Sequence, residues 1–284
     1  MKSSLSVYSA FVLLLTLPVT LSHYFRRSTG DDYGVSTLDK LRLAVRMVSN
    51  NVRVTSASNF VEHLVMATTI LNVPRSVKGC IVECGSYKGG SATNLSLVAK
   101  LCDRELEVFD SFGGLPAPSE EDRVHTVLHR GELHMYEEGA WAGTLEEVKH
   151  AIMSYGAIEA CNFHVGYFDT TLPEFNKNTV FVFADVDLRD SIATCLRHLW
   201  PLMPDGGYFY THEAAHMEIV KLFFNQEWWQ SRFGCEPPGL VGAGTGLGLI
   251  PSAGGFRSAL GYSIKAPEGV HLEEVPQPGL LNAS

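Results

Sequence analysis

The sequence lacks paired cysteines. Its six cysteines are scattered along the chain and match neither a CxxC pair nor a zinc-binding pattern. A disulfide framework is not expected either, because 284 residues with 45% apolar side chains can form a full core without covalent cross-links. We therefore interpret the cysteines as reduced, small apolar side chains.

Positive charge is also scarce. The chain has 22 Lys and Arg against 31 Asp and Glu, a net charge of -9. Nucleic acids and anionic membrane surfaces are therefore poor partners, because the general electrostatic interaction would be repulsive. A small uncharged or cationic substrate fits this composition better.

Long apolar runs are absent except for residues 7–25, with Lys2 before the run and Arg26-Arg27 after it. A short apolar core behind a positive segment is typical of a signal peptide or signal anchor. We expect residues 1–27 to target the chain to a membrane or the secretory pathway, with a cytoplasmic location as the alternative. The other interpretation is an N-terminal helix that packs on the domain or on a second subunit of a homo-oligomer. Since the segment precedes every motif below, we expect it to be dispensable for chemistry.

Helical and strand-like periods alternate along the rest of the chain. The predicted strands are 80–84, 106–110, 162–166, 180–185 and 206–211, with two more near 240–250 and 258–265. The predicted helices are 37–52, 56–71, 89–101, 144–155, 191–202 and 213–233. Residues 116–143 are predicted to form a long loop with one short helix. Its histidines, His125, His129 and His134, could face a substrate, but we interpret them as solvated. This order predicts an α/β, Rossmann-like fold: a mainly parallel seven-stranded sheet with helices on both faces. The predicted domains are a helical cap at 28–75, the main domain at 76–268 and a loose tail at 269–284.

The first predicted strand runs into a glycine turn with the pattern Glu83-x-Gly85-x-x-x-Gly89. A dinucleotide fingerprint would need glycines at 83, 85 and 88, and positions 83 and 88 are Glu and Lys. The observed pattern is instead typical of class I methyltransferases that use S-adenosylmethionine (SAM), although it can also be a structural turn of another α/β protein. In that class the loop approaches the methionine part of SAM, where Glu83 would supply negative charge.

Asp110 ends the next predicted strand, where a carboxylate can accept hydrogen bonds from both hydroxyls of a ribose. It does not distinguish SAM from a nicotinamide cofactor, because both contain ribose. The residues predicted to bind SAM are Glu83, Gly85, Ser86, Tyr87, Gly89, Ser91, Asp110 and Ser111.

Four further segments occur in a fixed order: Asp110–Pro116, Gly166–Pro173, Ala184–Ser191 and Leu199–Gly207. With them the chain resembles the macrocin O-methyltransferase (TylF-type) family of class I SAM-dependent methyltransferases, over roughly residues 38–265. The resemblance implies methyl transfer from SAM to a hydroxyl of a small molecule, such as a natural-product sugar.

The resemblance also implies a divalent metal. In the family, an acidic residue at the start of a D-x-D segment and two acidic residues after the fifth strand hold a magnesium-like ion that orients the acceptor. Asp185 matches the first position, but His212-Glu213 stands where the family has Asp-Asp, and Arg189 stands where it has Tyr. Either Asp185, His212 and Glu213 hold the metal, or the metal is lost and His212 is the general base. Both alternatives make His212 and Asp185 catalytic.

Two other functions stay open. A nicotinamide-dependent oxidoreductase could use a related sheet, although the glycine pattern argues against it. A SAM-fold protein that binds without catalysis stays open because of the His212-Glu213 departure.

Overall fold

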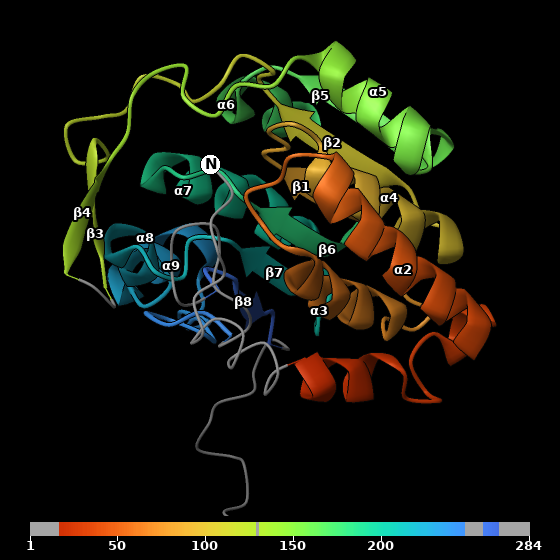
Figure 1. Ribbon diagram of the computed structural model, residues 1–284. Helices are drawn as coiled ribbons and strands as arrows, with labels where there is room; N and C mark the ends of the chain where they lie inside the picture. The colour runs from red at the N-terminus through yellow and green to blue at the C-terminus, as the bar shows by residue number, and fades with distance from the viewer. Residues whose placement is uncertain (1–16, 129–130, 248–257, 267–284) are drawn as a thin grey trace, which may run out of the picture.

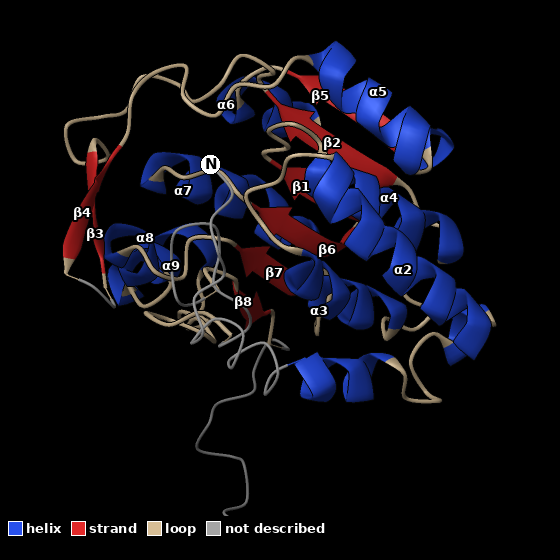
Figure 2. Ribbon diagram, in the orientation of Figure 1, coloured by secondary structure: helices blue, strands red, loops and turns tan. Residues whose placement is uncertain are grey.

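A mostly parallel six-stranded sheet lies at the centre of the chain (Figures 1 and 2). The structure, a computed structural model, describes residues 17–128, 131–247 and 258–266. The strands of this sheet are β1 (Cys80–Cys84), β2 (Leu106–Asp110), β5 (Cys161–Val165), β6 (Thr179–Ala184), β7 (Tyr208–Thr211) and β8 (Gly261–Ile264). Their order is β5-β2-β1-β6-β7-β8, and only β8 runs antiparallel to its neighbour. The chain order reverses between β1 and β6, and ligands of open α/β sheets bind at such a switch point.

Helices cover both faces of the sheet, as the alternation predicts (Figure 2). One layer contains α2 (Thr37–Arg53), α3 (Phe60–Leu71), α4 (Gly90–Leu101) and α5 (Leu145–Tyr155). The other contains α6 (Phe168–Thr171), α7 (Arg189–Leu199), α8 (Met217–Leu222) and α9 (Gln226–Phe233). Short 3-10 helices occur at Asp31–Tyr33, Ile158–Ala160, Leu172–Glu174 and Trp200–Leu202. Successive strand residues point to opposite faces, so Ile81 joins one core and Val82 the other.

Three helices of the first layer begin with a capping box. Ser36, Asn59 and Thr144 each accept a hydrogen bond from the backbone of the third helical residue, whose acidic side chain accepts one in return. The motif satisfies donors that a helix cannot satisfy internally, which fixes where α2, α3 and α5 start. The box at Thr144 confirms the predicted start of that helix.

The long loop before α5 differs from the prediction. Instead of a short helix, it contains an antiparallel hairpin of β3 (Val124–Val127) and β4 (Glu132–Met135), which stands apart from the main sheet (Figure 1). The predicted helix 213–233 is also divided, because Asn225 caps α9 by accepting a hydrogen bond from the Trp228 amide at 2.9 Å.

A seventh strand near 240–250 is not formed by the part of that range that the structure describes. Residues 240–247 are mostly turns, and they meet the sheet at a single bridge between Val241 and Tyr262. Residues 248–250 lie outside the described residues.

The predicted boundary at residue 27 falls within packed structure. Tyr24 is fully buried, and its hydroxyl donates a hydrogen bond to the Lys40 carbonyl at 2.9 Å. The Lys40 ammonium in turn donates a hydrogen bond to the Arg26 carbonyl at 2.6 Å. Within the described residues, no helix is both long and apolar enough to span a membrane. The rest of the predicted targeting segment, residues 1–16, lies outside the described residues.

Candidate active site

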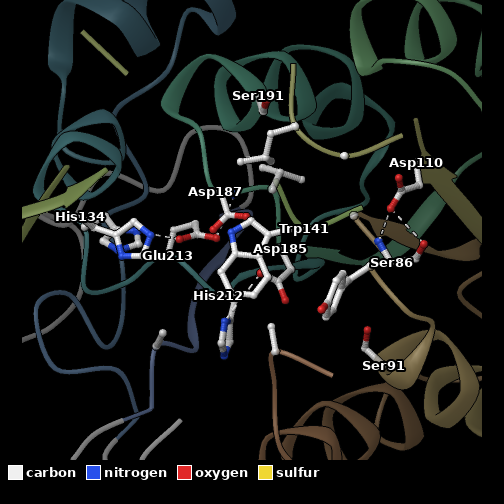
Figure 3. Close-up of a pocket in the computed structure, with 18 of the residues that line it drawn as sticks. Ser86, Ser91, Asp110, His134, Trp141, Asp185, Asp187, Ser191, His212 and Glu213 are labelled. Atoms are coloured by element: carbon white, nitrogen blue, oxygen red, sulfur yellow. Dashed lines mark hydrogen bonds and ion pairs between the residues drawn. The ribbon is translucent and has the colours of Figure 1, made fainter. Parts of the chain in front are cut away.

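A cavity of about 530 Å³ opens at the carboxyl ends of β1, β2, β6 and β7. Its volume is within the range of small-molecule sites. The turn after β1 and the end of β2 form one side, the segments after β6 and β7 form the other, and the β3–β4 hairpin adds a further wall. Figure 3 shows the two sides facing each other, with Ser86, Ser91 and Asp110 opposite Asp185, His212 and Glu213.

The turn after β1 needs glycine for a specific steric reason. Gly85 has a φ of +84°, and a Cβ at this position would lie 2.0 Å from the Asp185 carbonyl oxygen. The turn is thus packed directly on the end of β6, which links the two sides of the cavity. Gly89, also at a φ of +84°, provides the N-cap of α4. Among the residues predicted to bind SAM, all but Glu83 and Gly89 line the cavity.

Asp110 organises this side of the cavity. Its Oδ2 accepts hydrogen bonds from the Ser86 amide at 2.6 Å and the Ser86 hydroxyl at 3.0 Å, and its Oδ1 accepts one from the Phe112 amide at 2.7 Å. These bonds fix the orientation of the carboxylate relative to the turn. A carboxylate oxygen has more than one acceptor site, so Asp110 retains capacity for a ribose hydroxyl.

Glu83 lies behind the turn and is fully buried. Neither of its carboxyl oxygens has a hydrogen-bond partner among the described residues, and burial raises its pKa to about 8. The expected negative charge is therefore mostly absent at neutral pH. An orphaned buried carboxyl next to the glycine turn fits a cationic ligand, because a nearby positive charge would favour ionisation of the carboxyl.

On the other side, the predicted catalytic pair is in contact. His212 Nδ1 lies 3.7 Å from Asp185 Oδ1, and His212 Nε2 lies 3.4 Å from Glu62 Oε2, on α3. Burial alone would lower the pKa of His212, but the two carboxylates outweigh it and raise the pKa to about 10. His212 is therefore an imidazolium at neutral pH, with both nitrogens protonated. Burial raises the pKa of Asp185 to about 6, and His212 opposes that rise.

The Glu213 carboxylate accepts hydrogen bonds from His216 and Asp187. Its Oε2 accepts a hydrogen bond from His216 Nδ1 at 2.8 Å, and its Oε1 accepts one from the Asp187 amide at 3.1 Å. Asp187 has a left-handed backbone, with a φ of 62°. Burial raises the pKa of Asp187, and the neighbouring carboxylates of Glu213 and Asp185 raise it further. A strained acidic residue at the end of a strand is a common feature of functional sites.

The three predicted metal ligands do not fit a metal ion in this arrangement. Within the described ranges, no group of three His, Cys, Asp or Glu side chains has the geometry to hold one. In this arrangement both ring nitrogens of His212 face carboxylates, Glu62 on one side and Asp185 on the other. That the three residues share an ion stays a prediction.

The interpretation of the loop histidines as solvated is wrong for His125, whereas His134 lies where the alternative places it, facing the cavity. His125 is fully buried on β3, with its Nε2 2.8 Å from Asp122 Oδ1, and His134 on β4 lines the cavity. His129 lies outside the described residues. The hairpin is held against the site because the Thr126 amide donates a hydrogen bond to Glu218 Oε2 at 2.9 Å.

Sequence reasoning missed Glu62, Asp187 and His216. Asp187 was detectable, because it is the second acidic residue of the D-x-D segment. His216 follows Glu213 at a spacing of three, which brings their side chains together. In the sequence, Glu62 is recognisable only as a helix-capping residue. It contacts His212 although the two residues are 150 positions apart in the chain.

Comparison with known proteins identifies the family and the fold. Residues 25–228 match the family described as macrocin-O-methyltransferase (TylF). The solved structure of the O-methyltransferase NovP is 20% identical, has a TM-score of 0.52, and covers 82% of this chain and 83% of NovP. The calicheamicin methyltransferase CalS11 is 14% identical, has a TM-score of 0.51, and covers 80% of this chain and 92% of CalS11. At these identities the two structures show a shared fold. The curated proteins provide no match.

Proposed function

Because this chain belongs to the macrocin-O-methyltransferase (TylF) family, whose members are SAM-dependent O-methyltransferases, we propose that it methylates a hydroxyl of a small uncharged or cationic molecule, such as a natural-product sugar. The observation that carries the proposal is the single cavity that joins the Gly85 turn to the Asp185 cluster. A methyl donor on one side and an acceptor on the other would meet there. Holding two reactants in line is the main requirement of such a displacement.

The charge of the cavity supports this class of acceptor. None of the described residues that line it is Lys or Arg, and the cation among them, His212, is held between Glu62 and Asp185. Five lining residues are acidic: Asp110, Glu132, Asp185, Asp187 and Glu213. A phosphate or carboxylate on the acceptor would meet repulsion and would find no guanidinium to pair with. Leu133 and Trp141 add apolar surface, which suits the carbon skeleton of a neutral ligand.

Asp185 is our candidate for the proton acceptor. It lines the cavity, and burial holds its pKa at about 6, so that it is mostly ionised at neutral pH and still basic enough to accept a proton. Bound SAM would supply a methyl group on a positively charged sulfur. As the acceptor oxygen bonds to the methyl carbon, the hydroxyl proton passes to Asp185 and the methyl–sulfur bond breaks, leaving the neutral thioether S-adenosylhomocysteine. His212 keeps its proton throughout and stabilises the ionised form of Asp185.

The metal that the resemblance implies has no step in this scheme, because the residues as arranged do not fit it. A chelator distinguishes the two possibilities. If EDTA leaves turnover unchanged, the scheme stands. If EDTA abolishes turnover and magnesium restores it, the cluster rearranges around an ion and the proton acceptor must be reassigned.

The function is tested with purified protein, labelled SAM and matched acceptors. We expect methylation of neutral or amine-bearing glycosides, and little or none of the same glycosides carrying a phosphate. Asp185→Asn should retain SAM affinity but lower the rate about 10²–10⁴-fold, the usual range for a general base. Preference for the phosphorylated acceptors would contradict the proposed class of acceptor but not methyl transfer itself. SAM binding without any S-adenosylhomocysteine formation would favour the non-catalytic alternative.

A further inference from the structure

Two aromatic rings meet at the opening of the cavity. The rings of Tyr87 and Trp141 lie edge to face, with their centroids 5.6 Å apart and an angle of 84° between their planes. Tyr87 belongs to the turn after β1, Trp141 precedes α5, and both line the cavity. Trp141 is 47% exposed, so it lies where the cavity meets solvent. Figure 3 shows its indole at the centre of the view, with Ser86 on one side and Glu213 on the other.

Both aromatic residues have a backbone conformation that side chains of their size disfavour. Tyr87 has a φ of 47° and Trp141 a φ of 58°, which is the left-handed region. Such strain persists only where the surrounding structure imposes it, and it clusters at binding sites. Glycine would relieve the strain at either position, so the presence of two aromatic side chains indicates a use for the rings.

Backbone contacts hold Trp141 on the cofactor side of the cavity. A Cβ on Gly143 would lie 1.8 Å from the Tyr87 carbonyl oxygen, so the segment after Trp141 packs directly on the turn that follows β1. Just before Trp141, the Ala140 carbonyl accepts a hydrogen bond from the Leu115 amide at 2.9 Å. Trp141 is thus anchored to the turn after β1 and to the segment after β2. This placement favours a contact with the cofactor over a contact with the acceptor.

The two rings differ in the cations around them. The Lys88 ammonium lies 6.0 Å from the centre of the Tyr87 ring and is paired with Glu147 at 2.9 Å. Among the described residues, no Lys or Arg lies over the Trp141 ring. The face of Trp141 is therefore available to a cationic ligand in the cavity, and Tyr87 provides the edge-to-face contact that orients it.

We propose that the face of Trp141 binds the positively charged sulfur of SAM and thereby distinguishes SAM from its neutral product. An aromatic face attracts a cation, and tryptophan does so most strongly. S-adenosylhomocysteine lacks the methyl group and the charge, so the ring holds it less firmly. Trp141 is then a specificity-determining residue, and Tyr87 is a positioning residue for it. The inference rests on the use of SAM in the proposed function, but it does not depend on the identity of the acceptor.

An aromatic ring suits this place better than another carboxylate. Burial raises the pKa of Asp187, and the neighbouring carboxylates of Glu213 and Asp185 raise it further. A fourth carboxylate at position 141 would add to this repulsion and would compete for the proton of the acceptor. An indole attracts a cation without carrying a formal charge, and its apolar surface excludes water from the reacting groups.

The test measures binding by calorimetry, with the full chain and three ligands: SAM, S-adenosylhomocysteine, and sinefungin, which carries an ammonium in place of the charged sulfur. Trp141→Leu keeps an apolar side chain and the same disfavoured φ, so the main loss is the aromatic face. We expect the preference for SAM over S-adenosylhomocysteine to fall about 3- to 30-fold, the range of a cation–π contact. The preference for sinefungin over S-adenosylhomocysteine should fall in parallel.

Three further proteins make the test specific to the ring face. Trp141→Phe should give an intermediate preference, because phenylalanine attracts cations less strongly. Phe224→Leu is the matched control, since it removes a ring that is 54% exposed and lies outside the cavity, and it should bind like wild type. A tetrafluorinated tryptophan at position 141, introduced by stop-codon suppression, keeps the shape of the ring but withdraws electron density from its face. It should lower the preference for SAM even if Trp141→Leu fails to fold.

Three results would overturn the proposal. Equal losses of SAM and S-adenosylhomocysteine affinity in Trp141→Leu would mean that the ring only shapes the cavity. Unchanged affinity for both ligands would mean that the ring does not contact the cofactor. A changed KM for the acceptor alone would assign Trp141 to the acceptor side. A wild-type protein that does not bind SAM would contradict the proposed function as well, whereas one that binds SAM without methylating any acceptor would leave the role of Trp141 intact.

Discussion

Replacing Glu62 with glutamine tests the charge arrangement of the active site. Glu62 Oε2 lies 3.4 Å from His212 Nε2, and the same carboxylate closes the capping box of α3. Glutamine has the same shape and also closes capping boxes, so the substitution removes charge while the helix start is kept. Glu147 is the matched control, because it closes the capping box of α5 without contacting a histidine.

The expected magnitude follows from the two carboxylates that hold His212. They raise its pKa from 6.5 to about 10 against the effect of burial. Losing one of them should lower the pKa of His212 toward its ordinary value, at a cost on the order of 1 to 3 kcal/mol. A histidine whose pKa is raised by folding stabilises the protein fully below its unfolded pKa, and this stabilisation is lost as the pH rises through the folded value. The destabilisation by Glu62→Gln should thus be complete near pH 6.5 and should disappear above about pH 10.

The pKa is measured by NMR of histidine-labelled protein, with the His212 signal assigned through a His212→Gln variant. The free energy of unfolding is measured with urea at pH 6.5 and pH 10. Glu147→Gln should leave the His212 signal unchanged at every pH. If Glu62→Gln does not move the His212 midpoint, or costs the same free energy at both pH values, then Glu62 does not hold His212 as a cation.

Three further changes test the turn, the ribose contact and the N-terminal helix. Asp110→Ala should weaken SAM binding by roughly 1.5–3 kcal/mol, as for a lost charged hydrogen bond, and unchanged affinity in calorimetry would remove Asp110 from the site. Gly85→Ala should destabilise the protein by well over the ~1–2 kcal/mol expected for Gly206→Ala. Both glycines have a positive φ, but only a Cβ at position 85 would overlap backbone atoms. Equal losses of stability in thermal unfolding would contradict this overlap. Deleting residues 1–27 removes the buried Tyr24 and should destabilise the fold by roughly 3–5 kcal/mol; a stable, SAM-binding chain without residues 1–27 would support the predicted boundary.

Four of the five parallel strands, β1, β2, β5 and β6, could be predicted from the sequence because each is a short run that ends in or is followed by a glycine or an aspartate, whereas β7 is followed by His212. Burial on both faces requires such runs, and the turns that follow them carry the binding residues. The β3–β4 hairpin could not be predicted in the same way, because β4 is mostly exposed and has no buried face to impose an alternating pattern. Its position depends instead on contacts with α8, more than 80 residues later.

The cofactor side of the site was predictable for a related reason. Gly85 and Asp110 are local features, each at the end of its own strand, and parallel pairing brings those ends together. The acceptor side depends on a tertiary contact that no local pattern encodes. Glu62 lies on α3, outside the strand-and-turn motifs. In the sequence, its capping role is a sufficient reason for its presence, so nothing indicates a second role.

The departure of His212 from the family pattern therefore gains a physical explanation that neither prediction contained. Both alternatives, a metal ligand and a general base, require a nitrogen with a free lone pair. In the structure each nitrogen faces a carboxylate, Glu62 on one side and Asp185 on the other. Buried carboxylates are costly unless a positive charge accompanies them, and a protonated histidine provides one from within the chain. The contacts of His212 with Glu62 and Asp185 link position 212 to the carboxylate at 62. Whether His212 serves as a fixed cation, a metal ligand or a general base stays a prediction, which the Glu62→Gln variant and the EDTA experiment test.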